Sequence, residues 1–263
     1  MDGEHHISTA FVGFGISTCI TLLVLERNGL CSSDMVIFEA NAGRHPHKTL
    51  CFWSRPGDAL DDLLGDIVER RWTRATTDGN ASQTLDGFAY CQLNITALFE
   101  RATAIIHRHN IQMRHESVRR VDDHDDYAAV VGSASQCTAR WVFDSRPPEK
   151  ATSGLLQSFI GYELTHTDPV FDADEIRLMD FRVPQDNNTQ FVYVLPSSPH
   201  RALVEFTRFG EERIDERIAR ERCEAYVDAY LKGGDLRVKE RGVIPMTSEH
   251  QPTQSTSIIP LGA

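Results

Sequence analysis

TAFVGFGIST, residues 9–18, places Gly13 and Gly15 between an apolar run and a stretch that can form a helix. We predict a buried strand over residues 9–14, a helix over residues 17–28 and a second strand over residues 34–39. A strand, a glycine turn, a helix and a strand within about 35 residues make a βαβ unit, whose connection should be right-handed.

The glycine turn has the spacing GxGxxG, with Thr18 at the third glycine position. The first glycine permits a tight turn, the second lets the backbone approach a pyrophosphate, and the third lets the helix pack closely on the strand. Glu39 ends the second predicted strand, where an acid can bind a ribose. Gly13, Gly15, Thr18 and Glu39 therefore predict a dinucleotide site, in which the Cβ of Thr18 loosens the helix packing. The alternative is an inherited βαβ unit that no longer binds a dinucleotide.

Composition narrows the classes of partner. The chain has 263 residues and a net charge of −11, so it would repel a phosphate backbone, and we exclude nucleic acid. Its six cysteines are scattered without a CxxC pair, which argues against a disulfide framework and a zinc site. The pair His45 and His47 lacks the spacing of a metal motif, so no metal is predicted.

No targeting or membrane-spanning signal is evident in the sequence. The first residues are polar and acidic, unlike a signal peptide, and the apolar-leaning run over residues 16–25 is too short to span a bilayer. We predict a cytoplasmic protein without a transmembrane segment. Peripheral membrane contact and the oligomeric state are left open.

The rest of the chain changes character near residue 155. Before it, helices are predicted over residues 60–71 and 95–109 and a strand over residues 140–144. After it come strands over residues 159–165, 176–183, 190–195 and 201–209, a helix over residues 214–231 and an extended piece at residues 243–245. We predict a dinucleotide-binding part (1–155), a β-rich substrate part (156–240) and a return segment (241–263).

Several short motifs follow one another in the second half. They are QSFIG (157–161), LMDFR (178–182), FVYVLP (191–196), ALVEFT (202–207) and GVIPMT (242–247), preceded by FDSRP (143–147). Their order and spacing resemble bacterial lycopene beta-cyclases over residues 8–262. The resemblance implies an α/β fold, in which a Rossmann-like FAD-binding domain of the glutathione-reductase type is interleaved with a mainly antiparallel β-sheet substrate domain.

The resemblance also implies an activity. Members of the family bind FAD, reduced by NAD(P)H, and cyclise the linear ends of lycopene with no net redox change. Their proposed catalytic acid corresponds to Glu205, and residues 179–182, which include Asp180 and Arg182, line the same region. The implied partner is an apolar small molecule.

The residues themselves suit the protonation of an alkene. Glu205 and Asp180 lie in apolar strands, where desolvation raises the pKa of a carboxyl group. Aromatic side chains could stabilise a carbocation through cation–π attraction; the candidates are Phe181, Phe191, Tyr193, Phe206 and Phe209. The alternative for the carboxylates is structural pairing with Arg182, Arg201 or Arg208. The resemblance favours catalysis for Glu205, whereas Asp180 and Arg182 share a strand face and could simply pair.

Further cofactor and substrate contacts are predicted outside these motifs. Arg44 follows Glu39 in a loop and could reach an adenine or a phosphate, unless it is solvated. Gln92 precedes a predicted helix, where flavoproteins of this fold often place a polar cofactor contact, and Asp144 ends a predicted strand. Trp53 matches a family region near the flavin or substrate; its alternative is a core position.

Cyclases of this family continue beyond the segment that matches residues 258–262 with an element that closes the flavin site. We therefore expect weak or no flavin binding and a smaller polyene as substrate, as in specialised natural-product biosynthesis. Two alternatives stay open: a flavin-dependent oxidoreductase or monooxygenase, and a flavin-free cyclase or non-catalytic binder of an apolar small molecule.

Overall fold

The computed structural model describes residues 6–41, 48–146, 154–246 and 255–261. The chain forms two compact units. The first contains residues 1–47, 94–149 and 249–263, and the second contains residues 48–93 and 150–248. The predicted dinucleotide-binding part, residues 1–155, thus includes a segment, residues 48–93, that packs with the second unit.

The first unit is built on a largely parallel sheet. Its strands are β1 (His6–Val12), β2 (Met35–Phe38), β8 (Gln112–Arg114), β9 (Val118–Asp123), β10 (Ala128–Gly132), β11 (Gln136–Asp144) and β17 (Ile258–Pro260). The order is β8-β2-β1-β11-β10-β9, with β17 also paired to β11. Strands β8, β2, β1, β11 and β17 run parallel, and β9 and β10 are antiparallel additions. The predicted βαβ unit is therefore confirmed as β1-α1-β2.

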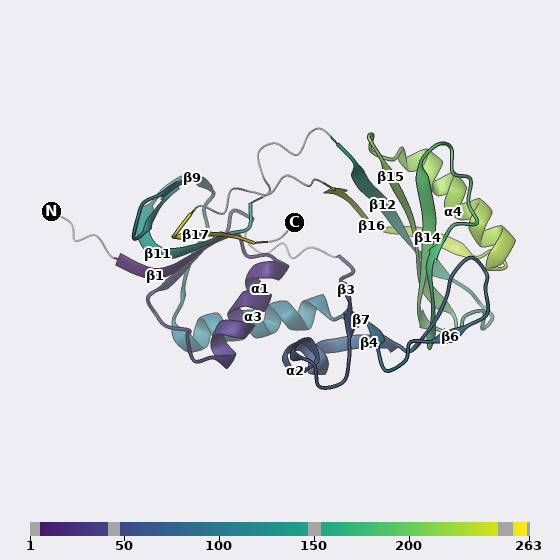
Figure 1. Ribbon diagram of the computed structural model, residues 1–263, viewed down its shortest axis with the longest axis horizontal. Helices are drawn as coiled ribbons and strands as arrows, with labels where there is room; N and C mark the ends of the chain where they lie inside the picture. The colour runs from purple at the N-terminus through teal and green to yellow at the C-terminus, as the bar shows by residue number, and fades with distance from the viewer. Residues whose placement is uncertain (1–5, 42–47, 147–153, 247–254, 262–263) are drawn as a thin grey trace. The chain divides into compact units, whose positions relative to one another are not determined.

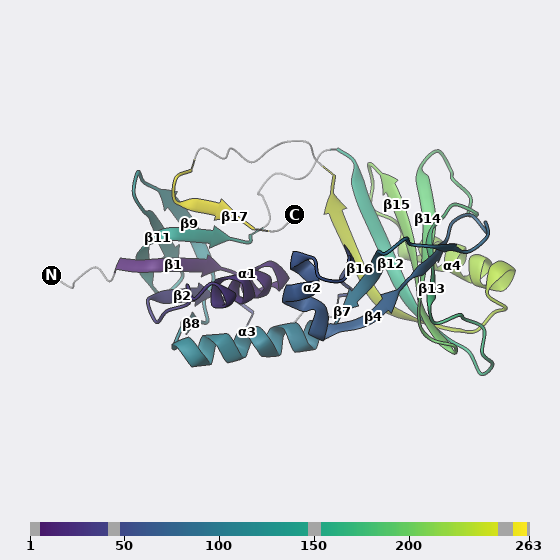
Figure 2. The ribbon, with the colours of Figure 1, turned by 60° about the horizontal axis from the view of Figure 1, so that its bottom comes forward.

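Two helices, α1 (Ile16–Arg27) and α3 (Ile95–His109), lie side by side next to the sheet (Figure 2). Both agree closely with the sequence predictions. Asn94 caps α3 through a hydrogen bond from the Ala97 amide at 3.0 Å, and Asn110 ends it in the left-handed conformation. The ring of Phe99 on α3 packs edge-to-face on Phe14, 5.5 Å away, so α3 supports the glycine turn.

The second unit contains a large, mainly antiparallel sheet. Its strands are β5 (Arg74–Thr76), β6 (Gln83–Thr84), β12 (Leu156–Thr165), β13 (Glu175–Asp180), β14 (Thr189–Ser198), β15 (Arg201–Gly210) and β16 (Asp235–Pro245). They follow the order β16-β12-β15-β14-β13-β5-β6, and β5 and β13 pair in parallel. Figure 1 shows the long strands of this sheet in colours from teal (β12) through green to yellow (β16). The predicted strands after residue 155 are confirmed, except that the one predicted over residues 176–183 ends at Asp180, so Arg182 follows the strand and does not lie on its face.

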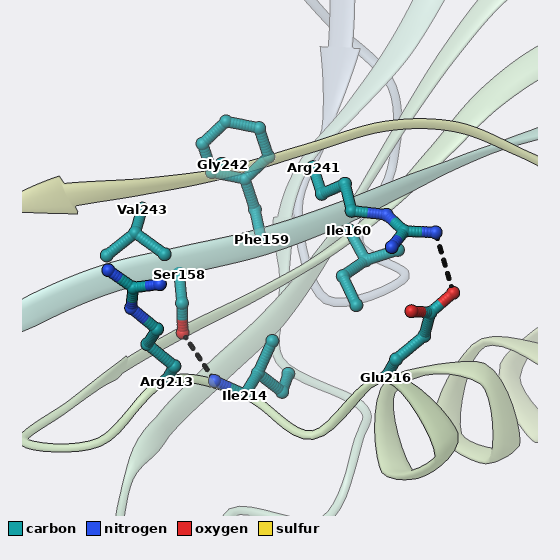
Figure 3. Close-up of a pocket in the computed structure, with 9 residues that line it drawn as sticks. All are labelled: Ser158, Phe159, Ile160, Arg213, Ile214, Glu216, Arg241, Gly242 and Val243. Atoms are coloured by element: carbon teal, nitrogen blue, oxygen red, sulfur yellow. Dashed lines mark hydrogen bonds and ion pairs between the residues drawn. The ribbon is translucent and has the colours of Figure 1, made fainter.

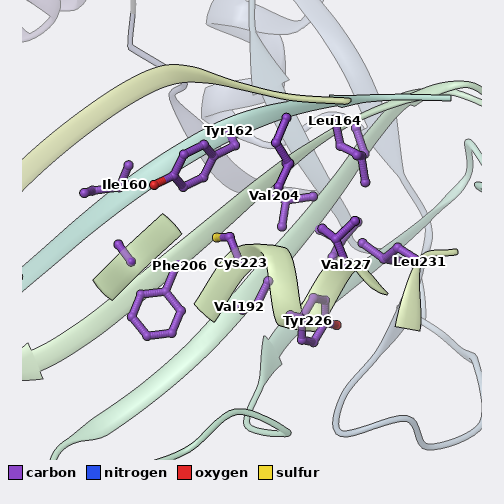
Figure 4. Close-up of a cluster of buried hydrophobic side chains, with 14 of the residues drawn as sticks. Ile160, Tyr162, Leu164, Val192, Val204, Phe206, Cys223, Tyr226, Val227 and Leu231 are labelled. Carbon is purple, nitrogen blue, oxygen red and sulfur yellow. The ribbon is translucent and has the colours of Figure 1, made fainter. Parts of the chain in front are cut away.

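Helix α4 (Glu216–Tyr230) covers one face of this sheet. Asp215 begins the helix by accepting hydrogen bonds from the amides of Arg217 and Ile218. Alternate residues of β12, β14 and β15, including Tyr162, Val192 and Phe206, pack against Cys223 and Val227 of the helix in a buried cluster (Figure 4). The other face of the sheet is therefore free to carry polar groups.

A three-stranded sheet completes the second unit. Its order is β3-β7-β4, from β3 (Cys51–Ser54), β7 (Ala89–Leu93) and β4 (Val68–Trp72). The predicted helix over residues 60–71 is wrong beyond residue 64, because α2 (Ala59–Leu64) gives way to a 3₁₀ turn at Gly65–Ile67 and then to β4. Trp72 explains the strand: it is fully buried, and its indole N–H donates to the Pro196 carbonyl at 3.0 Å. Tertiary packing thus overrides a short helical pattern.

Candidate active site

The glycine turn in the first unit has the geometry that its sequence predicts. Gly13 follows β1 with a φ of +95°, and a Cβ there would collide with Ser145 Oγ. Gly15 precedes α1, and a Cβ there would meet nothing within 4 Å. No side chain caps the first turn of α1 among the described residues. Open space and uncapped helix amides are what an anion such as a pyrophosphate requires.

Thr18 is accommodated at the third glycine position. Its side chain is fully buried, and its hydroxyl donates to the Gly13 carbonyl at 2.8 Å. The hydroxyl therefore joins the first turn of α1 to the glycine turn. The loosening of the helix packing by Thr18 stays a prediction.

Glu39 follows β2 and faces the same turn. Its carboxylate accepts hydrogen bonds from the amides of Phe14 at 2.7 Å and Asn41 at 2.6 Å. Asp144 ends the neighbouring β11, paired in register with Val12, and its carboxylate forms an ion pair with Arg146 at 2.5 Å. The parallel strands thus bring Glu39 and Asp144 to the edge where the turn lies. Arg44 lies outside the described residues.

Glu205 lies at the centre of the second unit's large sheet. On β15 it pairs with Gly161 of β12 on one side and Tyr193 of β14 on the other, and Gly161 pairs in turn with Glu240 of β16. Residues opposite one another in antiparallel strands project to the same face. Glu240, Glu205 and Tyr193 therefore share the face that α4 does not cover.

The surroundings of Glu205 favour its protonated form. Burial raises the pKa of its carboxyl to about 7, the negative charge of Glu240 adds to the rise, and a hydrogen bond from Thr207 opposes it. The Thr207 hydroxyl lies 3.1 Å from Glu205 Oε1. Arg201 and Arg208, the alternative partners, are turned to Glu163 and to the Glu212 carbonyl. Among the described residues no basic side chain pairs with Glu205.

An aromatic cluster lies beside Glu205. The ring of buried Phe191 is 5.2 Å from Tyr193, 5.4 Å from Phe181 and 6.0 Å from Phe209, centre to centre. Phe206, by contrast, belongs to the buried cluster against α4. The structure thus brings four of the five predicted aromatic residues together and leaves Phe206 on the opposite face, because side chains alternate along β15.

Asp180 and Arg182 form a structural pair. Asp180 is fully buried; its carboxylate binds the Arg182 guanidinium through two oxygens, the shorter contact being 2.5 Å, and accepts the Tyr226 hydroxyl at 2.6 Å. Burial alone would raise the pKa of Asp180, but the hydrogen bonds from Arg182 and Tyr226 hold it below its usual value. An acid that stays ionised and paired is a poor proton donor.

Trp53 and Gln92 belong to the three-stranded sheet. Trp53 is exposed on β3, with its ring 4.9 Å from that of Tyr90, and Gln92 on β7 pairs with Cys51. The core alternative for Trp53 therefore does not apply. Cys51 and Tyr90 pack against the cluster that contains Leu203, so this sheet borders the face that carries Glu205.

Sequence reasoning missed Glu240. Its neighbours Lys239 and Arg241 make it look like part of a charged run on an exposed strand. Glu240 is nevertheless only 7% exposed, whereas Lys239 and Arg241 are exposed. The available signal was the alternation of Glu240 with Gly242 and Ile244, which marks one face of a strand.

A pocket of about 480 Å³ opens on the opposite face of the sheet (Figure 3). Ser158 and Ile160 line it from β12, and four of its lining residues are hydrogen-bonded in two pairs. Arg241 bonds Glu216 at 2.8 Å, and the Ser158 hydroxyl accepts from the Ile214 amide at 3.2 Å. Ile160 lines this pocket, whereas its neighbour Gly161 pairs with Glu205. Because successive residues of a strand project to opposite faces, the pocket and Glu205 lie on opposite faces of the sheet.

Two further findings concern the described parts of the chain. None of their helices is long and apolar enough to cross a membrane. Within the same residues, no group of three or more His, Cys, Asp or Glu side chains is placed to hold a metal ion.

Comparison with known sequences gives consistent matches. A family model described as "Lycopene cyclase protein" matches residues 9–263. A lycopene beta-cyclase of Paracoccus sp. (strain N81106 / MBIC 01143) is 30% identical over 131 residues, which cover 48% of this chain and 33% of that protein. A lycopene beta-cyclase of Pantoea ananas is 36% identical over 115 residues, which cover 41% of this chain and 29% of that protein. The matched part is about a third of each relative's length.

Solved structures share the fold at low identity. The Diels-Alderase PyrE3 of pyrroindomycin biosynthesis superimposes with a TM-score of 0.64 at 13% identity, covering 96% of this chain and 58% of that one. The halogenase PltM in complex with phloroglucinol and FAD gives a TM-score of 0.56 at 12% identity, covering 91% of this chain and 60% of that one. At such identities the likeness shows the fold alone, a Rossmann-like FAD-binding fold.

Proposed function

Because the chain belongs to the lycopene cyclase family, we propose that it cyclises an apolar polyene by acid catalysis, with Glu205 as the acid. One observation carries the proposal: Glu205 is a carboxyl without a basic partner among the described residues, and its environment raises its pKa to about 7. Such a group holds its proton near neutral pH and can donate it.

The proposed reaction begins with transfer of the Glu205 proton to a terminal carbon–carbon double bond. The O–H bond breaks, the π pair forms a C–H bond, and a carbocation remains beside the new carboxylate. A neighbouring double bond of the same molecule attacks the cation and closes the ring. Loss of a ring proton to the Glu205 carboxylate gives the cyclic product and restores the acid. No electrons are gained or lost.

The aromatic cluster supports this chemistry. A carbocation is attracted to the faces of aromatic rings, most strongly where water is excluded. Phe191 and Tyr193 lie on the strand next to Glu205, and Phe181 packs on Phe191. These rings would border the charge that forms when Glu205 gives up its proton, whereas Asp180 and Arg182 would support the sheet.

FAD fits the glycine turn of the first unit. The open space at Gly15 and the uncapped amides of α1 would receive the pyrophosphate, and Glu39 would bind a ribose. When bound and reduced, a flavin supplies a negatively charged ring that can stabilise a cation. NAD(P)H is proposed as the reductant. The neighbour PltM was solved with FAD, which supports the choice of cofactor.

The test replaces Glu205 by Gln, which keeps the shape of the side chain and removes the acid. Cyclisation of lycopene and of shorter acyclic polyenes by the FAD-reconstituted, reduced protein should fall at least about 100-fold. The control is Glu163→Gln, which should retain activity. Glu163 lies on β12, on the sheet face that also carries Glu205, but it is half-exposed and lies 3.8 Å from Arg201. Full activity in Glu205→Gln would rule out Glu205 as the acid. Oxygen consumption coupled to turnover would instead identify a monooxygenase.

A further inference from the structure

Glu240 is a second carboxylate on the Glu205 face. Its Oε2 accepts a hydrogen bond from the Thr49 amide at 2.6 Å, a bond that stabilises negative charge on that oxygen. Its other oxygen, Oε1, is buried and has no hydrogen-bond partner among the described residues. A buried carboxylate oxygen left without a partner is costly, so this arrangement calls for an explanation.

Gly161 lies between the two carboxylates. It pairs with Glu205 on one side and with Glu240 on the other, so the two glutamates are two strand spacings, or about 10 Å, apart at the backbone. A Cβ on Gly161 would lie 2.9 Å from Glu240 Cγ and 3.4 Å from Oε1. The Glu240 side chain thus lies over Gly161, beside the side chain of Leu203, in space that a residue larger than glycine would need.

The other titratable groups around Glu205 do not compensate the negative charge of Glu240. Tyr193 faces it from β14, Cys51 from β3 and Tyr90 from β7, and each has its pKa raised, first by burial. Cys223 of α4 lies behind the sheet and is likewise kept in its neutral form by burial. Among the described residues, Glu240 is therefore the charged group that adds to the effect of burial on the pKa of Glu205, because a nearby negative charge disfavours ionisation of the Glu205 carboxyl.

We propose that Glu240 is a positioning residue, a fixed negative charge held by the Thr49 amide that keeps the proton on Glu205 across the gap at Gly161. This role rests on the proposed function of Glu205 as the acid. Glu240 need not touch the substrate. It acts through Glu205, whose proton it retains until an alkene takes it.

The test titrates the Glu205 carboxyl directly by NMR, with Glu205→Gln used to assign its signal. In Glu240→Gln the midpoint of the Glu205 titration should move to lower pH, and each pH unit of movement means a tenfold smaller protonated fraction above the midpoint. Glu163→Gln is the matched control and should leave the midpoint in place. An unchanged midpoint in a folded Glu240→Gln protein would overturn the proposal.

Glu240→Asp provides a second variant in case the amide substitution disturbs folding. It keeps the charge but shortens the side chain, so the midpoint should lie nearer to that of the unmodified protein. A midpoint equal to that of Glu240→Gln would show that charge is not the cause and would overturn the proposal. The titration needs no turnover, so the two ideas fail separately: an active Glu205→Gln protein refutes the catalytic role, and an unmoved midpoint refutes the role of Glu240.

Discussion

Glu205→Gln should stabilise the protein at alkaline pH while it abolishes the proposed activity. The pKa of Glu205 is raised from 4.5 to about 7 in the folded chain. The folded state therefore binds the proton more tightly than the unfolded state does. This favourable contribution is fully present below pH 4.5 and is lost as the pH rises through about 7. At about 1.4 kcal/mol per pKa unit, ionising Glu205 costs the fold about 3 kcal/mol.

The assay is urea unfolding at pH 5 and pH 8, followed by tryptophan fluorescence, to which buried Trp72 in the second unit contributes. Relative to the unmodified protein, Glu205→Gln should gain up to about 3 kcal/mol in free energy of unfolding between pH 5 and pH 8. Glu163→Gln, whose carboxylate is half-exposed, should show no such gain. If the stability of Glu205→Gln relative to the unmodified protein is the same at both pH values, Glu205 is not a destabilised acid, and the reasoning fails.

Two further predictions concern the residues around the two sites. Asp180→Asn should destabilise the second unit by about 3 kcal/mol, because it leaves Arg182 without the buried carboxylate that it binds. Urea unfolding measures this loss of stability. A loss under about 0.5 kcal/mol would contradict the structural role of Asp180. Gly13→Ala should weaken FAD binding about tenfold or more, because the new Cβ collides with Ser145 and the backbone has positive φ. Flavin fluorescence titration checks this against Gly29→Ala, whose φ is also positive but whose Cβ meets nothing.

The sequence alone was sufficient for local features. Glycine spacing and apolar runs predicted β1-α1-β2, because the turn, the helix and the strands are set by residues close together in the chain. The apolar strand around Glu205 was also readable, and so was the pairing option for Asp180 and Arg182. Phe206 directly follows Glu205, and successive side chains of a strand project to opposite faces, so the sequence also contained the signal that separates these two residues.

Only the tertiary structure decided which distant residues meet. Strand pairing places Gly161 and Glu240 beside Glu205, and these contacts join three segments far apart in the chain. Register across a sheet depends on the whole set of strands, so the alternation of Glu240 with Gly242 and Ile244 indicates a shared strand face but not that this face is buried. The same holds for residues 68–72, where the burial of Trp72 against Pro196 outweighs a helical pattern. Local sequence predicted the glycine turn and the elements that flank it, and the family resemblance pointed to Glu205, whereas long-range packing decided which charged residue lies beside Glu205.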